Sequence, residues 1–368
     1  MNYSRLPLGV KLVGSNVKRV VNVAINGIDN TLVYEGFRFG DMFNQFYDSI
    51  IKKDDAPLKK KLKKDAARCY VRWGFTPRDY FLFGFHDQNI TVSQRKSFIS
   101  DYYKDYSLFS KEGAPKYVEL YDKAKFLNRI APEHLGNRGA YFLFNQLVDE
   151  KEFVDFALRY SDLFIKPNSS SYGNGAMTAL IESEVEARAL FAKLKEAETD
   201  WIVEKRITQS DEMAKWNASS VNTIRVNTFL TNRGFFVLAP FIRTGRKGSI
   251  VDNGGKGGIY ALIDERTGLV LTDGRDEKGG FYPVHPDSGI AFKNTMIPEW
   301  DGLLRTVEKV HRSNMSNHIY ISWDFAYTND GWAIIEGNWG QFICQQSSSH
   351  RGFKKEFVKY LKGQAITR

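Results

Sequence analysis

The chain of 368 residues contains 42% hydrophobic and 26% charged residues, close to the averages of soluble globular proteins. This composition excludes wholesale disorder and a collagen-like repeat, and the length predicts two or three compact units. Lysine and arginine number 52 against 43 aspartate and glutamate residues. The net charge of +9 favours anionic partners, such as nucleotides, phosphorylated substrates, acidic glycans, nucleic acid or an anionic membrane face.

Targeting segments and cysteine or histidine metal motifs are not evident. The longest aromatic and aliphatic stretch, Tyr80 to Phe85, is far shorter than the ~20 apolar residues that span a bilayer. The N-terminus lacks the apolar core of a signal peptide, so we expect a cytoplasmic protein. Cys69 and Cys344 are the only cysteines, and we expect both to be buried. The six histidines show no metal-binding spacing, so any metal should be held by oxygen ligands.

Helical spacing of apolar residues is typical of residues 41–125, which predicts a mainly helical start. Seven lysines between Lys52 and Lys64 accompany only Asp54 and Asp55. This segment is interpreted either as a solvated helix face or as an anion-binding patch for a membrane surface or an acidic polymer. Two apolar stripes support the helical prediction: Leu58, Leu62 and Ala66 in one, and Tyr117, Leu120, Tyr121 and Ala124 in the other.

From about residue 153 the pattern alternates between helix and strand, with glycine-rich breaks at 252–258 and 279–280. The glycine-rich breaks are expected to be loops that turn tightly or approach a ligand. This alternation of helix and strand patterns predicts an α+β architecture with much antiparallel sheet. The expected strands are 163–165, 201–203, 223–230, 235–242, 319–327 and 332–337, and the expected helices are 182–196, 303–311 and 353–361.

The GxxxxGK[ST] motif of a P-loop does not occur. The run from Gly173 to Thr178 resembles the dinucleotide-binding fingerprint but lacks its final glycine. A looser candidate begins at Lys166, which ends a predicted strand. The segment 167–175 that follows is rich in serine, asparagine and glycine. Its backbone N–H groups can fold over phosphate oxygens, although an ordinary exposed lysine before a loop gives the same pattern.

Acidic and amide side chains near the C-terminus suggest a metal site. Glu336 and Asn338 are two residues apart on a predicted strand and therefore share a face. A three-residue hairpin loop with Gly331 in the left-handed conformation places Asp324 opposite Glu336, whereas a two-residue turn at Asp330 and Gly331 separates them. We predict the three-residue loop. Two acids and an amide suit Mg²⁺, and the alternative is a solvated pair on a sheet face.

A further polar segment follows the strand at 201–203. Glu204 at the strand end is able to accept a hydrogen bond from an exocyclic amine, and Asp211 is able to accept from ribose hydroxyls. Both are equally compatible with ordinary surface positions.

Together these motifs resemble the ATP-grasp enzymes, and specifically the ATP-grasp group associated with sugar transfer and surface-polysaccharide genes. The resemblance covers residues 117–350 and depends on the order of several short motifs. They are Tyr121-Asp122-Lys123, Phe164-Ile165-Lys166-Pro167 with its glycine loop, Ile202-Val203-Glu204-Lys205, Val221-Asn222-Thr223-Ile224-Arg225-Val226, Gly257-Gly258, His285-Pro286, Ser322-Trp323-Asp324-Phe325 and Ile334-Ile335-Glu336-Gly337-Asn338.

The resemblance implies an ATP-grasp fold, in which two α+β subdomains clasp ATP, preceded by a mainly helical region. The corresponding division is 1–114 for the helical region, 115–205 for the first subdomain and 206–368 for the second. Gly337 stands where many ATP-grasp ligases have a bulkier apolar residue, and the N-terminal region does not resemble the usual preceding α/β domain.

The resemblance also implies roles for individual residues. Lys123, for which Lys125 is an alternative, and Lys166 contact phosphates, and the loop with Ser171, Gly173 and Gly175 closes over them. Glu204, Lys205 and Ile207 meet adenine and Asp211 the ribose, while Asp324, Glu336 and Asn338 hold one or two Mg²⁺ ions. Arg225 and Arg243 neutralise charge on the transferred phosphoryl group. Apart from the resemblance, His285 with Asp287 is a candidate to contact the acceptor or to act as a base, and the alternative is a structural histidine in a proline-rich loop.

The resulting hypothesis is an ATP- and Mg²⁺-dependent carboxylate–amine ligase that works through an acyl phosphate. The implied partners are an amino acid and a sugar or uronic acid of a polysaccharide precursor, with peripheral contact to membrane-bound glycan machinery. One alternative is a kinase that phosphorylates a hydroxyl with His285 or Asp287 as base, and another is a noncatalytic nucleotide-binding scaffold of glycan assembly. Nucleic-acid binding is not expected, because the basic residues form no recognisable reading module.

Overall fold

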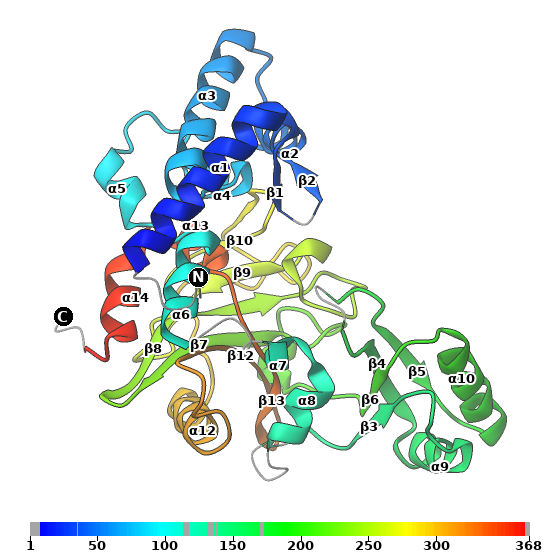
Figure 1. The fold of residues 1–368 in the computed structure, drawn as a ribbon. Coiled ribbons are helices and arrows are strands. Elements are labelled where there is room, and N and C mark those ends of the chain that lie inside the picture. Colours follow the sequence, from blue (N-terminus) through cyan, green and yellow to red (C-terminus); the bar gives the residue numbers. More distant parts are fainter. Residues whose placement is uncertain are drawn as a thin grey trace.

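The computed structural model describes residues 8–34, 36–112, 118–130, 135–136, 138–169 and 173–364. Figure 1 shows a group of N-terminal helices above a large sheet, and a smaller sheet with its own helices to one side. Three hydrophobic cores correspond to these three parts. None of the helices within the described ranges is both long and apolar enough to cross a lipid bilayer.

The N-terminal part is held together by aromatic packing. Its core includes Phe43, Tyr70 and Phe81, and the rings of Phe43 and Phe81 lie 5.3 Å apart between centroids. The predicted lysine-rich helix begins at Ala56, so five of the seven lysines lie in it, whereas Lys52 and Lys53 precede it. Asp55 caps its start by accepting from the Leu58 backbone at 2.8 Å. The elements are α1 (Leu8–Asn30), β1 (Leu32–Tyr34), β2 (Phe37–Arg38), α2 (Phe39–Phe46), a π-helix (Tyr47–Ile51), α3 (Ala56–Trp73), α4 (Pro77–Leu82), α5 (Val92–Ser97) and α6 (Asp101–Glu112).

The small sheet has the strand order β3-β6-β4-β5 and is antiparallel throughout. Its core joins one face of the sheet to helices α9 and α10, with Phe153 and Leu194 fully buried. The elements are α7 (Val118–Tyr121), α8 (Lys123–Arg129), β3 (Tyr141–Phe144), α9 (Glu150–Tyr160), β4 (Asp162–Pro167), β5 (Met177–Leu180), α10 (Glu184–Glu196) and β6 (Trp201–Lys205).

The large sheet is also antiparallel, with the order β11-β10-β9-β8-β7-β12-β13. Figure 1 shows α12 below this sheet and α13 with the N-terminal helices above it. The elements are α11 (Asp211–Ala214), β7 (Thr223–Thr231), β8 (Gly234–Thr244), a 3₁₀ helix (Gly254–Lys256), β9 (Ile259–Leu262), β10 (Gly274–Arg275), β11 (Phe281–Tyr282), α12 (Trp300–Asn314), β12 (Tyr320–Thr328), β13 (Gly331–Asn338), α13 (Ile343–Ser349) and α14 (Lys354–Leu361).

The N-terminal part packs directly on the large sheet. Phe241 of β8, Tyr260 of β9 and Cys344 of α13 belong to the same core as the N-terminal aromatic residues. Cys69 and Cys344 are both buried and unbridged, which confirms that prediction. The helical start therefore covers one face of the large sheet instead of forming a separate appendage.

The predicted α+β class with antiparallel sheets is confirmed. One helix prediction was wrong in its continuity. The stripe from Tyr117 to Ala124 begins outside the described residues, and the chain then forms α7 and α8 with a break at Asp122. The Asp122 side chain accepts from the Lys125 backbone at 3.0 Å and caps α8, so a new helix starts there.

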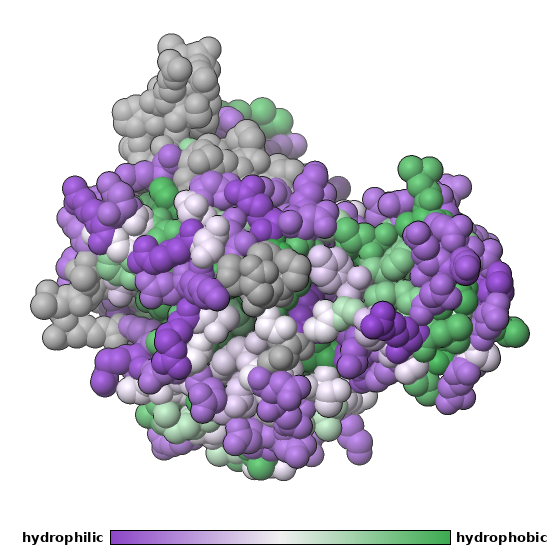
Figure 2. All heavy atoms as spheres, turned by 90° about the horizontal axis from the view of Figure 1, so that it is seen from below, coloured by the Kyte–Doolittle hydropathy of each residue, from purple (hydrophilic) through white to green (hydrophobic). Residues whose placement is uncertain are grey.

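The small lobe projects from the body of the protein, and green apolar side chains are visible on it in Figure 2. Leu147 is 94% exposed and Val185 is 77% exposed. β6 ends at Lys205 and β7 of the other sheet begins at Thr223. The subdomain boundary at 205/206 lies between these strands and stays a prediction, and the boundary at 114/115 lies outside the described residues.

Candidate functional site

Two adjacent strands bring the predicted acids together. Asp324 of β12 lies opposite Glu336 of β13, as the sequence predicted. The predicted loop length was wrong, because Thr328 pairs with Gly331 and leaves a two-residue connection. A bulge at Ile335, between the pairs 325/334 and 324/336, supplies the missing residue and restores the register.

Asn338 completes this acidic cluster. Its Nδ2 donates to Asp324 Oδ2 at 3.2 Å and to Glu336 Oε1 at 3.0 Å. Asp324 is almost fully buried, whereas Glu336 and Asn338 are half-buried. The structure therefore places two carboxylates and one amide in a single patch at the edge of the large sheet.

Two arginines from neighbouring strands bind the central acid. Arg225 of β7 donates through Nε to Asp324 Oδ1 and through Nη2 to Oδ2, both at 2.6 Å. Arg243 of β8 places Nη2 2.9 Å from the same Oδ2. Burial opposes ionisation of Asp324, but the two guanidinium groups lower its pKa to about 2. Asp324 is therefore a permanent anion at neutral pH.

The donor set fits a magnesium ion. A carboxylate has about four lone-pair positions, and Asp324 Oδ1 accepts only one of the described hydrogen bonds, from Arg225. Glu336 offers a second carboxylate. The Asn338 amide now turns its nitrogen toward both acids, and a half-turn of this group would present its oxygen as a third ligand. No cluster of three or more histidine, cysteine, aspartate or glutamate side chains suited to a metal occurs among the described residues.

Glu204 lies in an ion-pair triad between the two sheets. Lys166 of β4 places Nζ 3.2 Å from Glu204 Oε2, and Arg138 donates through Nε to Oε1 at 3.0 Å. Arg138 also donates to the backbone oxygen of Ile334 in β13 at 2.9 Å. Although burial disfavours the charged form, Arg138 and Lys166 lower the pKa of Glu204. The side chain expected to meet adenine is thus engaged by two cations.

Lys123 faces the same region from α8. Its Nζ donates to the backbone oxygen of Asn168 at 3.2 Å. Burial lowers the pKa of Lys123, and the charges of Glu336, Lys166 and Glu204 all act on it. By contrast, the side chain of Lys125 is 64% exposed and pairs with Asp122 at 3.1 Å. Of the two lysines considered, Lys123 is the one close to the acidic cluster.

The glycine loop packs between the two sheets. Gly173 and Gly175 have φ values of 68° and 75°, in the left-handed region that favours glycine. A Cβ atom at Gly173 would lie 2.9 Å from Asn253 Nδ2, and one at Gly175 would lie 2.9 Å from Pro167 Cγ. Ser171 of the same loop lies outside the described residues. Side chains at the two glycines would therefore push the loop away from both neighbours.

The residues expected to meet adenine and ribose follow one another along the chain from the end of β6 to the start of α11. Lys205 and Asp211 are exposed and Ile207 is half-buried, so a ligand can reach all three. Asp211 opens α11, which is capped by Ser210. Their roles stay predictions.

His285 connects two loops of the protein. It is fully buried, its Nε2 lies 2.9 Å from the Gly245 oxygen, and its Nδ1 accepts from the Asp287 backbone at 3.3 Å. Burial lowers the pKa of His285. Asp287 binds Arg246 at 2.7 Å and 2.9 Å through its two oxygens, and this contact lowers the Asp287 pKa. Both groups proposed as a base are therefore held by internal contacts.

Arg138, Asp252 and Arg78 lie in or beside the site and were not singled out from the sequence. Asp252 accepts from the Thr223 backbone at 3.0 Å and lies 3.6 Å from Arg243; burial raises its pKa. The charges of Arg78, Arg225 and Arg243 all act on the buried Cys344 thiol. Asp252 could have been noted beside the glycine run 254–258, but Arg138 and Arg78 carry no local signal.

Residues 104–359 match the model of the family described as sugar-transfer associated ATP-grasp. No curated protein matches the sequence.

Similar solved structures include D-alanine–D-alanine ligase from Bacillus anthracis, with 13% identity, a TM-score of 0.37, and coverage of 66% of this chain and 64% of that one. D-alanyl-alanine synthetase A from Vibrio cholerae has 12% identity, a TM-score of 0.40, and coverage of 67% and 65%. The ATP-grasp ligase PsnB, complexed with a phosphomimetic variant of its minimal precursor, Mg and ADP, has 13% identity, a TM-score of 0.39, and coverage of 71% and 66%. The chain thus spans slightly less than two thirds of the length of the first two.

Proposed function

The chain belongs to the sugar-transfer associated ATP-grasp family, and we propose that it is an ATP- and Mg²⁺-dependent ligase that joins a carboxylate to an amine. One observation carries the proposal. Asp324, Glu336 and Asn338 converge on the large sheet, while Lys123 lies in α8 and within electrostatic reach of both Glu336 and Lys166. Oxygen ligands for a metal thus lie close to cations suited to phosphate.

Each remaining group has a proposed task. Lys123 and Lys166 bind nucleotide phosphates, and the loop with Ser171, Gly173 and Gly175 closes over them and excludes water. Arg225 and Arg243 stabilise the charge on the transferred phosphoryl group. Adenine and ribose are assigned to the end of β6, with Glu204, Lys205 and Ile207 at the base and Asp211 at the sugar.

A magnesium ion would be held by Asp324, Glu336 and Asn338. When bound, it would neutralise phosphate charge. The bidentate contact of Arg225 keeps Asp324 ionised and fixed in orientation, so that Oδ1 keeps one direction.

The proposed reaction has two steps. A carboxylate oxygen attacks the γ-phosphorus of ATP, which breaks the bond to the β-phosphate oxygen and yields ADP and an acyl phosphate. An amine then attacks the carbonyl carbon, the carbon–oxygen bond to phosphate breaks, and the nitrogen releases a proton to the departing phosphate or to water as the amide forms. Carboxylates are poor electrophiles, and the first step supplies the leaving group that the second needs.

The most detailed part of the proposal concerns the identity of the two substrates. We assign an amino acid and a sugar or uronic acid of a surface-polysaccharide precursor, acting in the cytoplasm with peripheral contact to membrane-bound glycan machinery. The kinase alternative receives less support, because His285 and Asp287 are held by internal contacts.

The test is ADP release with amino acids combined with acidic sugars, followed by trapping with hydroxylamine. A ligase yields substrate-dependent ADP and a hydroxamate of the carboxylate substrate. ADP release with a phosphorylated product but no hydroxamate would establish the kinase instead. Absence of ADP release across the substrate panel would favour the noncatalytic scaffold.

A further inference from the structure

The positive charge of the protein is concentrated in its first hundred residues. Residues 1–100 contain 17 lysines and arginines against 9 aspartates and glutamates, a net charge of +8. The other 268 residues contain 35 against 34, a net charge of +1. The family match starts at residue 104. The basic character therefore belongs almost entirely to the helical region outside the match.

Helix α1 turns an apolar face toward solvent. Val17, Val20, Val21 and Ile25 are 55%, 49%, 47% and 75% exposed, and their spacing of three and four residues places them on one side of the helix. The opposite side contains Arg19, which is buried against the ring of Tyr102 at 4.8 Å. A surface helix of a globular domain normally has the reverse arrangement.

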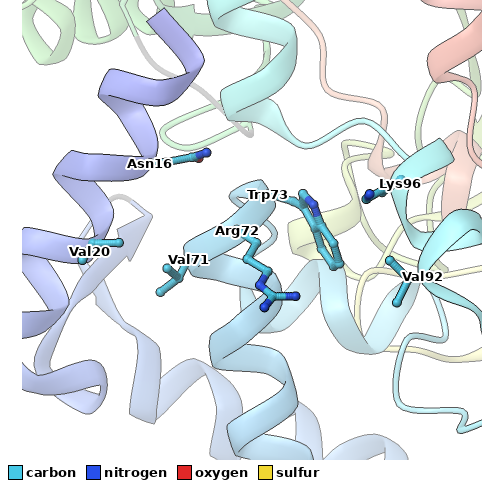
Figure 3. A pocket seen from close by; sticks show the side chains of 7 residues that line it. All are labelled: Asn16, Val20, Val71, Arg72, Trp73, Val92 and Lys96. Carbon is cyan, nitrogen blue, oxygen red and sulfur yellow. The ribbon is translucent and has the colours of Figure 1, made fainter. Parts of the chain in front are cut away.

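A groove beside α1 continues this face. Its volume is about 430 Å³, and Figure 3 shows Val20 and Val71 on either side of the gap between α1 and α3, with Trp73 directed toward α5. Two cations are also part of the lining. The lining residues are Asn16, Val20, Val71, Arg72, Trp73, Val92 and Lys96.

Exposed lysines of α3 extend the positive charge along the same side. Lys60 and Lys64 are one helical turn apart, and Val71 of the groove lies seven residues further, so the three follow one helix face. Both lysines are exposed, and neither forms an ion pair with any residue that the structure describes. Lys59 and Lys63, in contrast, pair with Asp48 at 3.2 Å and Asp29 at 2.7 Å.

We propose that α1, the groove and the exposed lysines form a surface that binds an anionic lipid bilayer. The apolar face would enter the interface between headgroups and acyl chains, with α1 parallel to the membrane plane, while Lys60, Lys64, Arg72 and Lys96 contact phosphate groups. This combination of exposed valines and isoleucine with lysines suits lipid better than an acidic polymer, which would leave the apolar face in water. A second copy of this chain fits the surface less well than lipid does, because a symmetric contact would bring together two regions of net charge +8, which repel each other.

The test uses the full chain and co-sedimentation with vesicles of phosphatidylcholine, with and without one third phosphatidylglycerol. The protein is expected to bind the anionic vesicles and to leave them at high salt. Val17→Ser/Val21→Ser/Ile25→Ser is expected to weaken binding more than about tenfold, because three apolar side chains lose their burial in the interface. Lys60→Gln/Lys64→Gln is expected to weaken it about fivefold per lysine.

Matched control variants distinguish binding by this surface from non-specific binding of the protein to vesicles. Leu147→Ser/Val185→Ser removes two apolar side chains of the small lobe that are more exposed than those of α1, and Lys151→Gln/Lys193→Gln removes two exposed lysines from α9 and α10. Neither control should change vesicle binding, and all variants should retain the wild-type circular dichroism and thermal midpoint. The charge variant keeps the test decisive if the apolar variant fails to fold.

Two results would overturn the proposal. One is no binding of the wild type to anionic vesicles, whether or not a dimer that α1 substitutions dissociate is found instead. The other is equal weakening of binding by the control variants. ADP release by the protein without vesicles should be the same in all these variants, because none of the substituted residues belongs to the proposed ligase site. A failed ligase assay and a failed vesicle assay are thus independent outcomes.

Discussion

The two sheets and the N-terminal helices use charge in opposite ways. Around the acidic cluster, each buried charge is compensated: Asp324 binds Arg225 and Arg243, and Glu204 binds Arg138 and Lys166. In the N-terminal region the excess charge is exposed. The net charge of the whole chain therefore describes the periphery and says little about the site, whose cations are balanced by its own acids.

This difference has a consequence for stability and activity. Removal of one partner from a compensated buried group leaves an isolated charge, whereas removal of an exposed lysine changes little in the folded state. Substitutions in the two regions should therefore affect different measurements.

The largest effect is expected from Arg138→Met. It removes a buried guanidinium that donates to both the Glu204 carboxylate and the Ile334 backbone oxygen, while Glu204 keeps Lys166. We expect the free energy of unfolding to fall by about 3–5 kcal/mol in urea denaturation, because each buried hydrogen bond to a charged group contributes about 1.5–3 kcal/mol. Arg188→Met is the control, because Arg188 forms exposed pairs with Glu150 and Glu184. Its urea midpoint should match the wild type. Equal losses in both variants would contradict the contrast between buried and exposed charge.

Asp324→Asn tests the acidic cluster directly. It removes the anion that Arg225 and Arg243 hold, together with one proposed metal ligand, so ADP release should fall about 10²–10³-fold. Glu308→Gln on α12 serves as the control, since Glu308 forms an exposed pair with Arg312. An Asp324 variant that folds normally and keeps full activity would remove Asp324 from the site.

His311 should make stability depend on pH. It is buried below the large sheet, with Nδ1 2.9 Å from Thr228 Oγ1 and Nε2 2.8 Å from the His318 oxygen, and burial lowers its pKa to about 4. The unfolded chain takes up the proton near its ordinary pKa of about 6.5. Unfolding free energy should thus fall by roughly 3 kcal/mol as the pH falls from about 6.5 to about 4.

His311→Asn should remove this part of the pH dependence. His86→Gln, at a half-buried histidine of the N-terminal region, should remove less. The measurement is urea unfolding of all three proteins across that pH range. Parallel curves for the wild type and the His311 variant would contradict the assignment.

The smallest effect concerns an N-terminal residue whose charge reaches the neighbourhood of the site. Arg78 lies in α4, outside the family match, yet its charge acts on Cys344 together with Arg225 and Arg243. If Arg78 contacts the carboxylate substrate, Arg78→Met should raise KM about tenfold with little change in kcat. Arg68→Met, at an exposed position of α3, is the control. Unchanged KM would confine the N-terminal region to a supporting role.

The sequence predicted the strands and their pairing more accurately than the connections between them. That Asp324 and Glu336 face each other could be predicted, but only on the expectation of a three-residue loop, in place of which a two-residue loop and a bulge give the same register. The length of the hairpin loop could not, because the bulge at Ile335 depends on strand packing and on no residue that marks a turn.

The residues of the candidate site could be proposed from the sequence, but the contacts between them could not. Glu204 was found from its place at the end of a strand, but Arg138 lies 66 residues earlier in the chain, and no local pattern announces that ion pair. His285 shows the same limit. Its loop can be recognised from proline and glycine, whereas its bond to Gly245, 40 residues away, depends on the tertiary fold.

The bulge also separates the tip of the hairpin from the site. The extra residue Ile335 lies between the pair of Asp324 with Glu336 and the turn. We therefore expect the pairing on the side of the acids to be independent of the residues that join Thr328 to Gly331. Asn329 and Asp330 are exposed at this tip. A peptide tag or a fluorescent reporter inserted between them should leave the acidic cluster in register, which makes this turn a practical position for labelling the protein.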